Sequence, residues 1–96
     1  MDLGNTIKNI RKQKDLTQDQ FASTCGITQT YLSQIENNQK EPALSILKAI
    51  AENLNIPLPI LFFQSLTEED VHPRKREIFN AISPSVKKII DEIFAV

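Results

Sequence analysis

Cysteine, histidine and glycine are scarce in this chain of 96 residues, which has one cysteine, one histidine, two glycines and no tryptophan. One cysteine cannot form a disulfide within the chain, and together with one histidine it cannot supply the three or four ligands of a zinc ion. Two glycines are too few for a loop that cradles phosphate groups. We therefore expect no catalytic residues, no metal and no cofactor, and a reducing, cytoplasmic setting.

Long hydrophobic runs are absent as well. No apolar run approaches the ~18 residues that a membrane span requires, and no charged start followed by an apolar segment indicates export. Hydrophobic residues make up 41% and charged residues 24% of the chain, a balance typical of one packed domain. We expect no membrane association.

Two short helices joined by a tight turn are predicted for residues 17–37. Thr17 suits the position just before the first helix, with Gln20 three residues on as the partner of a capping box. Thr28 suits the same position before the second helix. Gly26 lies between them, where a helix ends in the left-handed conformation that other residues resist. The pattern predicts a helix-turn-helix.

The second of these helices has two different faces. At about 100° per residue, Leu32 and Ile35 point to one side. An arc of about 140° on the other side holds only uncharged hydrogen-bonding side chains, namely Gln29, Thr30, Ser33, Gln34 and Asn37. This face is either a recognition surface or a solvated polar face.

The two helices and the segments beside them resemble the Cro/CI-type (XRE) helix-turn-helix regulators, the family of the phage lambda repressor. The resemblance runs from about Ile7 to Phe63 and is carried by the segments IRKQKDLTQDQFA, CGITQTYLSQIENNQKEP and LSILKAIAENLNIPLPILF. It implies an all-α, five-helix lambda repressor-like DNA-binding domain. In that domain the helix from Thr28 would lie in the major groove of double-stranded DNA.

The resemblance and the side-chain chemistry together assign the DNA contacts. Glutamine can form two hydrogen bonds to adenine, and a threonine methyl group can pack on thymine. The base contacts that we predict are Gln29, Thr30, Ser33 and Gln34. Contacts to the DNA backbone are predicted for Gln18, Thr28, Tyr31, Asn37, Asn38 and Lys40. The family has a glycine where this chain has Asn38.

Arg11 and Glu36 are expected to form a structural ion pair. In the family, an arginine of the first helix pairs with an acidic residue near the end of the recognition helix, and these are the matching positions. We favour a structural pair over a direct base contact, because an unpaired carboxylate facing DNA would repel the phosphates.

The charge balance is unusual for a DNA-binding domain, many of which are clearly basic. The formal net charge is −1, from 11 Lys plus Arg against 12 Asp plus Glu. Residues 1–64 contain six basic and six acidic side chains and so sum to zero. Affinity for DNA should therefore depend less on counterion release than in a basic protein.

Residues 65–96 lie beyond the resemblance, and we predict a linker followed by two C-terminal helices. Pro73 and Pro84 each suit the first position of a helix, with Ser83 as the cap of the second. The second helix has an apolar stripe formed by Val86, Ile89, Ile90, Ile93 and Phe94. This stripe either covers its own domain, together with the first of the two helices, or contacts a second subunit.

The function that fits these patterns best is sequence-specific DNA binding by a transcriptional regulator. We expect a repressor acting as a homodimer on a palindromic operator, because two-fold symmetry places two recognition helices about one duplex turn, ~34–36 Å, apart. The domain division would be 1–64 for DNA binding and 65–96 for a possible dimerisation element. The alternative is an antitoxin-like or other regulator whose C-terminal helices bind a partner protein.

Overall fold

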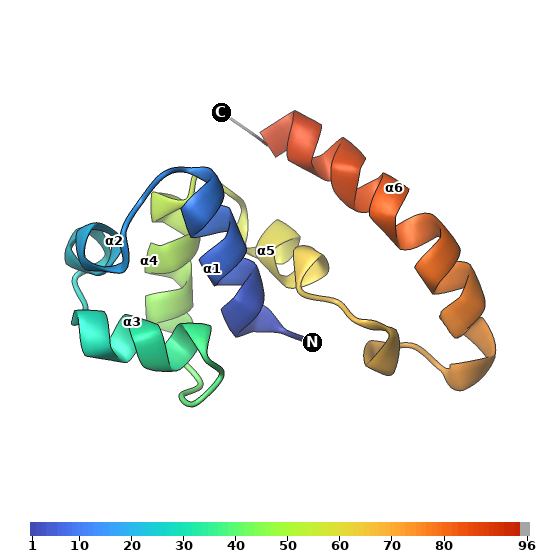
Figure 1. The fold of residues 1–96 in the computed structure, drawn as a ribbon, viewed down its shortest axis with the longest axis horizontal. Coiled ribbons are helices and arrows are strands. Elements are labelled where there is room, and N and C mark those ends of the chain that lie inside the picture. The colour runs from blue at the N-terminus through green and yellow to red at the C-terminus, as the bar shows by residue number, and fades with distance from the viewer. Residues whose placement is uncertain (95–96) are drawn as a thin grey trace.

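Residues 1–94 are described by the computed structural model, and they form six α-helices and two short 3₁₀ helices without a β-strand (Figure 1). The first five α-helices are α1 (Leu3–Gln13), α2 (Gln18–Cys25), α3 (Gln29–Glu36), α4 (Leu44–Asn53) and α5 (Leu58–Gln64). The 3₁₀ helices η1 (Glu68–Asp70) and η2 (Pro73–Lys75) lead to α6 (Arg76–Phe94). The predicted all-α fold with a five-helix N-terminal domain is confirmed.

The hydrophobic core lies where α1, α2, α3 and α4 meet, and α5 closes it from the side. Its most deeply buried apolar side chains are at most 2% exposed, and the large ones are Ile7, Phe21, Leu32, Ile35, Ile50, Leu54 and Leu61. Full burial of one such side chain is worth about 1.5–3 kcal/mol. Within residues 1–94 no single helix is long and apolar enough to cross a membrane, and α4 and α5 pass that test only as a pair bent by 91°.

The chain leaves three helices through residues with left-handed backbones. Asp15 after α1, Asn38 after α3 and Asn55 after α4 have φ values of 57°, 58° and 56°. Asparagine and aspartate adopt this conformation more readily than other residues that carry a Cβ. Asn38 can therefore stand where the family has a glycine.

Gly4 allows α1 to lie directly against the end of α3. A Cβ at this position would lie 2.6 Å from Oδ1 of Asn38 and 2.8 Å from the carbonyl oxygen of Glu36, and it would also meet the carbonyl oxygen of Ile35. The Gly4 N–H donates to Asn38 Oδ1 at 3.0 Å, and Asn38 Nδ2 donates to Asp2 Oδ1 at 2.8 Å. The loop after α3 is thus tied to the first turn of α1.

The prediction of two C-terminal helices was wrong, because α6 is one continuous helix with Pro84 inside it. Ser83 is therefore not an N-cap. An interior proline removes one backbone hydrogen bond and costs about 3 kcal/mol. The apolar positions nevertheless keep their helical period across Pro84, from Ile78 to Phe94, and a break there would turn the two halves of the stripe in different directions. Pro73 does begin a helix, the 3₁₀ helix η2.

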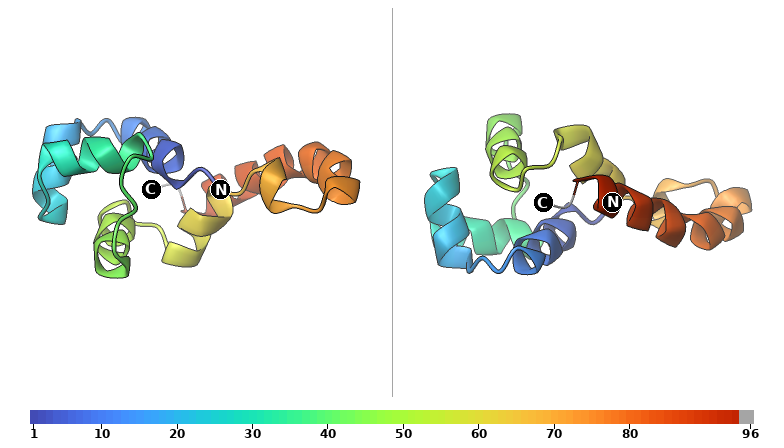
Figure 2. Two further views of the ribbon diagram at one scale, coloured as in Figure 1. Left: turned by 90° about the horizontal axis from the view of Figure 1, so that it is seen from below. Right: turned by 90° about the horizontal axis from the view of Figure 1, so that it is seen from above.

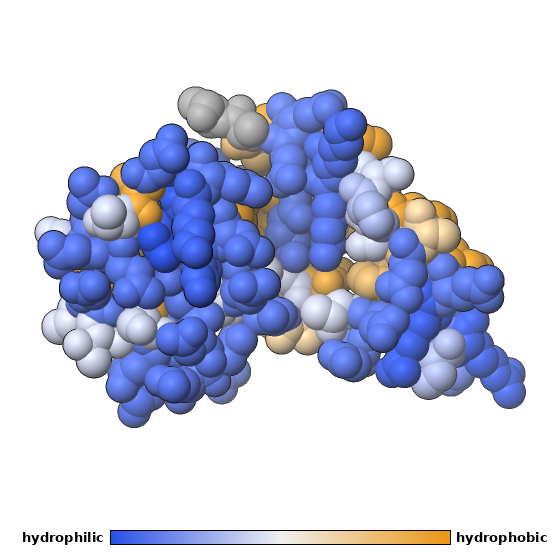
Figure 3. Space-filling model, in the orientation of Figure 1, coloured by the Kyte–Doolittle hydropathy of each residue, from blue (hydrophilic) through white to orange (hydrophobic). Residues whose placement is uncertain are grey.

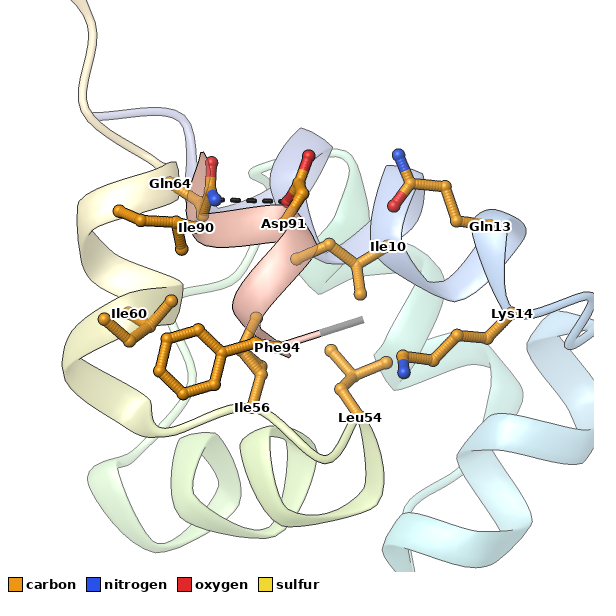
Figure 4. Close-up of a pocket in the computed structure, with 10 residues that line it drawn as sticks. All are labelled: Ile10, Gln13, Lys14, Leu54, Ile56, Ile60, Gln64, Ile90, Asp91 and Phe94. Carbon is orange, nitrogen blue, oxygen red and sulfur yellow. Dashed lines mark hydrogen bonds between the residues drawn. The ribbon is translucent and has the colours of Figure 1, made fainter. Parts of the chain in front are cut away.

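α6 lies beside the domain at the end remote from α2, as both views in Figure 2 show. Its C-terminal half covers a cavity of about 150 Å³ between α6, α1 and α5. Ile90 and Phe94 point toward the apolar side chains of this cavity (Figure 4), which belong to Ile10, Leu54, Ile56 and Ile60. Gln64 Nε2 donates to Asp91 Oδ1 at 3.2 Å beside it. No side chain between Arg76 and Phe94 is fully buried, and the backbone of α6 also approaches η1 and η2.

We expect Gly4→Ala to lower the free energy of unfolding by about 1–3 kcal/mol, because the added methyl group overpacks the contact between α1 and α3. Asn5→Ala is the matched control, since Asn5 is exposed on the same helix and alanine is a better helix former. Urea unfolding followed by circular dichroism measures both variants. A Gly4→Ala protein as stable as the control would contradict the close approach.

Candidate nucleic-acid interface

The helix-turn-helix is built by local caps. Thr17 Oγ1 accepts a hydrogen bond from the Gln20 N–H at 3.1 Å, and Gln20 Oε1 accepts one from the Thr17 N–H at 3.0 Å. This capping box starts α2 where the sequence predicts it. Gly26 ends α2 with φ of 73°, and no atom lies within 4 Å of a Cβ added there. Backbone strain, and not lack of space, therefore selects glycine at the turn.

α3 starts at its own threonine cap and is anchored by one apolar side. Thr28 Oγ1 accepts from the Tyr31 N–H at 3.1 Å. Leu32 and Ile35 are 0% and 2% exposed in the core. The other side of α3 faces outward at the edge of the domain (Figure 1), so the helix presents its polar side chains on a rigid support.

The polar side chains of α3 line a surface hollow of about 400 Å³. We call it the polar hollow, and its lining residues are Gln18, Gln29, Thr30, Ser33, Gln34 and Gln39. The structure thus brings together all four residues predicted to contact bases, and it adds Gln18 from α2. Every lining side chain is an amide or a hydroxyl, which can both donate and accept hydrogen bonds.

Gln39 is the one lining residue that the sequence analysis missed. Its N–H donates to the carbonyl oxygen of Gln34 at 2.8 Å, which folds the loop back onto the end of α3. The preceding residue, Asn38, has the positive φ that makes this reversal possible. The asparagine pair before Gln39 favours a turn in the sequence, but the direction of the returning chain depends on contacts with α1.

The remaining residues predicted to contact the DNA backbone do not line the polar hollow. Thr28, Asn37 and Lys40 are exposed. Tyr31 is half-buried and packs against the core. The Asn38 side chain is bonded to the first turn of α1. Asn38 is exposed as well, but its side chain already forms hydrogen bonds within the protein.

Arg11 and Glu36 form a buried ion pair between α1 and α3. Arg11 Nε lies 2.7 Å from Glu36 Oε2, and Arg11 Nη2 donates to Oε1 at 3.0 Å. The two residues are 5% and 3% exposed. Arg11 Nη1 also donates to the carbonyl oxygen of Leu16 at 2.6 Å, and Gln18 Nε2 donates to Glu36 Oε1 at 3.0 Å. The Glu36 carboxylate, which contacts Gln18 of the polar hollow, is therefore compensated by Arg11, and Gln18 is fixed beside α3.

The side chains that could act as a nucleophile or as metal ligands are Cys25, the one histidine and the acidic residues. Burial raises the pKa of the Cys25 thiol from 9.0 to about 11, and the residue lies in the core between α2 and α3. Among residues 1–94, no group of three His, Cys, Asp or Glu side chains is placed to hold a metal ion. The side chains that line the polar hollow can donate hydrogen bonds to polar groups and accept hydrogen bonds from them.

Several known proteins are similar in sequence to this chain. The model of the helix-turn-helix family matches residues 7–61. The immunity repressor protein of Bacillus phage phi105 is 33% identical over 90 residues, which cover 81% of this chain and 62% of that protein. The control protein C.MunI of a Mycoplasma species is 42% identical over 60 residues, covering 62% of this chain and 81% of that protein. The HTH-type transcriptional regulator SutR of Escherichia coli (strain K12) is 27% identical over 97 residues, which cover 98% of this chain and 54% of that protein.

The chain spans less than two thirds of the phage immunity repressor and about half of SutR. The match to the phage repressor extends over 90 residues, beyond the helix-turn-helix itself. Residues 7–61, which the family model matches, form most of the five-helix domain and include every residue that lines the polar hollow.

We expect Glu36→Ala to lower the free energy of unfolding by about 3–5 kcal/mol, because Arg11 is then left buried without its partner. Thermal unfolding followed by circular dichroism measures this change. Glu36→Gln is the control, since it keeps the shape and one acceptor oxygen and should lose less. A Glu36→Ala protein that keeps its melting temperature but no longer binds DNA would show that Glu36 is not a structural partner.

The Cys25 thiol should react with iodoacetamide at pH 8 about 100-fold more slowly in the native protein than in urea, because the thiolate is the reactive form. The raised pKa of Cys25 also affects stability. The contribution of the protonated thiol to the free energy of unfolding is complete below pH 9.0 and declines as the pH rises toward about 11. Mass spectrometry of the alkylated protein follows the rate. Equal rates in the native and unfolded protein would mean that the thiol is not buried.

Proposed function

Because the chain belongs to the Cro/CI-type helix-turn-helix family, we propose that it is a transcriptional regulator that binds double-stranded DNA sequence-specifically, with α3 in the major groove. The observation that carries this proposal is the polar hollow, in which Gln29, Thr30, Ser33 and Gln34 share one surface with Gln18. These side chains offer donors and acceptors to base edges. They come from a helix held firmly by its opposite side.

The readout that we propose follows from the chemistry of the amide groups. Gln29 and Gln34 each carry one donor and one acceptor group, the combination that N6 and N7 of adenine require. The methyl group of Thr30 suits thymine. The half-site should therefore contain A·T pairs.

Gln18 has a different role in this proposal. One N–H of its amide is already donated to Glu36, so the side chain is positioned before DNA arrives. We assign it to a phosphate group at the edge of the major groove, where contacts fix the register of a protein on the duplex. The exposed side chains of Thr28, Asn37 and Lys40 would serve the same purpose.

The regulator that we propose acts as a homodimeric repressor on a palindromic operator. One recognition helix contacts only a few base pairs, and a two-fold dimer doubles the length of sequence that is read. The half-sites would then be separated by one duplex turn or a multiple of it. The similarity to a phage immunity repressor supports repression over activation.

We expect Gln29→Ala and Gln34→Ala each to remove the base preference at one position of the half-site, at a cost of about 1–3 kcal/mol. Selection from random duplex DNA with the wild type and both variants measures the preference directly. Gln13→Ala is the control, because Gln13 is an exposed glutamine at the end of α1 and does not line the polar hollow. If both variants selected the wild-type motif, the assignment of base contacts would fail.

A further inference from the structure

α6 carries more apolar surface than its own domain covers. Phe79, Val86, Ile90 and Phe94 share one side of α6 and are half-buried, and Ile90 and Phe94 line the cavity against α1 and α5. The neighbouring side carries Ile78, Ile82, Ile89 and Ile93, which are 55%, 52%, 56% and 66% exposed. Figure 3 shows apolar residues gathered along the edge of the molecule where α6 lies.

These four exposed isoleucines, which we call the isoleucine strip, lie in one row along α6. At about 100° per residue they fall within an arc of roughly 60°. They extend over most of a helix of 19 residues, which is about 28 Å long. Exposed apolar side chains that gather on one face of a helix often mark an interaction site, whereas single apolar residues scattered over a surface are normal.

The spacing of the isoleucine strip is the same in both directions along the helix. Ile78 and Ile82 are four residues apart, Ile89 and Ile93 are four residues apart, and the two pairs lie seven residues from each other. Two copies of α6 in antiparallel orientation about a two-fold axis would therefore place Ile78 against Ile93 and Ile82 against Ile89. An isologous interface requires such a self-complementary surface, whereas an unrelated partner does not.

The centre of the strip suits a close crossing of two helices. Ser85, at the midpoint, is a small exposed residue on the same side of α6. Small side chains at a crossing point allow two helices to approach, and the larger ones on either side then interdigitate. No charged residue occurs between residues 78 and 86, so the first half of the strip has no charge to desolvate.

We propose that a second copy of the chain docks antiparallel on α6 through the isoleucine strip. This proposal rests on the dimer of the proposed function and gives that dimer its contact surface. It also changes the surface predicted from the sequence, because Ile90 and Phe94 point to their own domain while Ile78 and Ile82 belong to the interface. α6 lies at the end of the molecule remote from α2 (Figure 2), so docking on α6 would leave both polar hollows free for DNA.

Sedimentation equilibrium of the full chain at tens of micromolar tests the surface. The wild type should be a dimer, and Ile82→Glu and Ile89→Glu should each raise its dissociation constant by about 100-fold or more, because a charge would enter an apolar interface. Leu44→Glu is the matched control, since Leu44 is a 56% exposed leucine outside the strip and its replacement should leave the dimer intact. Circular dichroism checks that each variant keeps its helix content.

Disulfide trapping tests the orientation. An equal mixture of the Ile82→Cys and Ile89→Cys proteins should form mixed covalent dimers under oxidation, with at least about tenfold less cross-linking when either variant is oxidised alone. The native Cys25 is buried and present in every sample. Homodimeric cross-links of Ile82→Cys in place of mixed ones would overturn the antiparallel arrangement.

The remaining outcomes separate this inference from the proposed function. A wild-type monomer, or a dimer unaffected by both glutamate variants, overturns docking through the strip. Fluorescence anisotropy with a single selected half-site measures DNA reading independently of dimer formation. A monomer that still prefers its half-site would refute only the dimer surface, and a dimer without any sequence preference would refute only the proposed function.

Discussion

The buried pair of Arg11 and Glu36 is the interaction on which the geometry of the polar hollow depends. Its two direct hydrogen bonds join α1 to α3, the bond to the carbonyl oxygen of Leu16 fixes the chain before α2, and Gln18 adds α2 itself. Buried ion pairs contribute little net stability compared with apolar packing, but a broken one is costly. The pair therefore acts mainly as a constraint on the positions of α1, α2 and α3. If one of these helices shifted alone, a buried charge would be exposed or would lose its partner.

Much of the N-terminal domain was predictable because its signals are local. Thr17, Thr28 and Gly26 mark the ends of α2 and α3 through interactions with residues three or four positions away, and the apolar period marks the buried side of each helix. Gly4 and Gln39 were not predictable in this way. Gly4 is required by the end of α3, more than thirty residues along the chain, and the position of Gln39 depends on the loop that Asn38 ties to α1.

In the C-terminal segment a local signal and the helical period disagree. Pro84 has the local features of a helix start, and only the continuous stripe on both sides of it favours one helix. The sequence likewise shows that α6 is apolar over a wide arc, but not which part of that arc the domain covers. The division between a covered side with Ile90 and Phe94 and an exposed side with Ile89 and Ile93 depends on how α6 packs against α1 and α5.

The polar hollow is lined only by amides and hydroxyls, on a segment whose six basic and six acidic residues cancel. Attraction to any duplex, whatever its sequence, comes mainly from cationic side chains that displace counterions. A protein of this kind is held weakly by the bulk of a genome, so fewer copies are sequestered on irrelevant DNA. Under the proposed function, the ratio of operator binding to background binding rests on base contacts and not on charge, and a small number of molecules would suffice to occupy an operator.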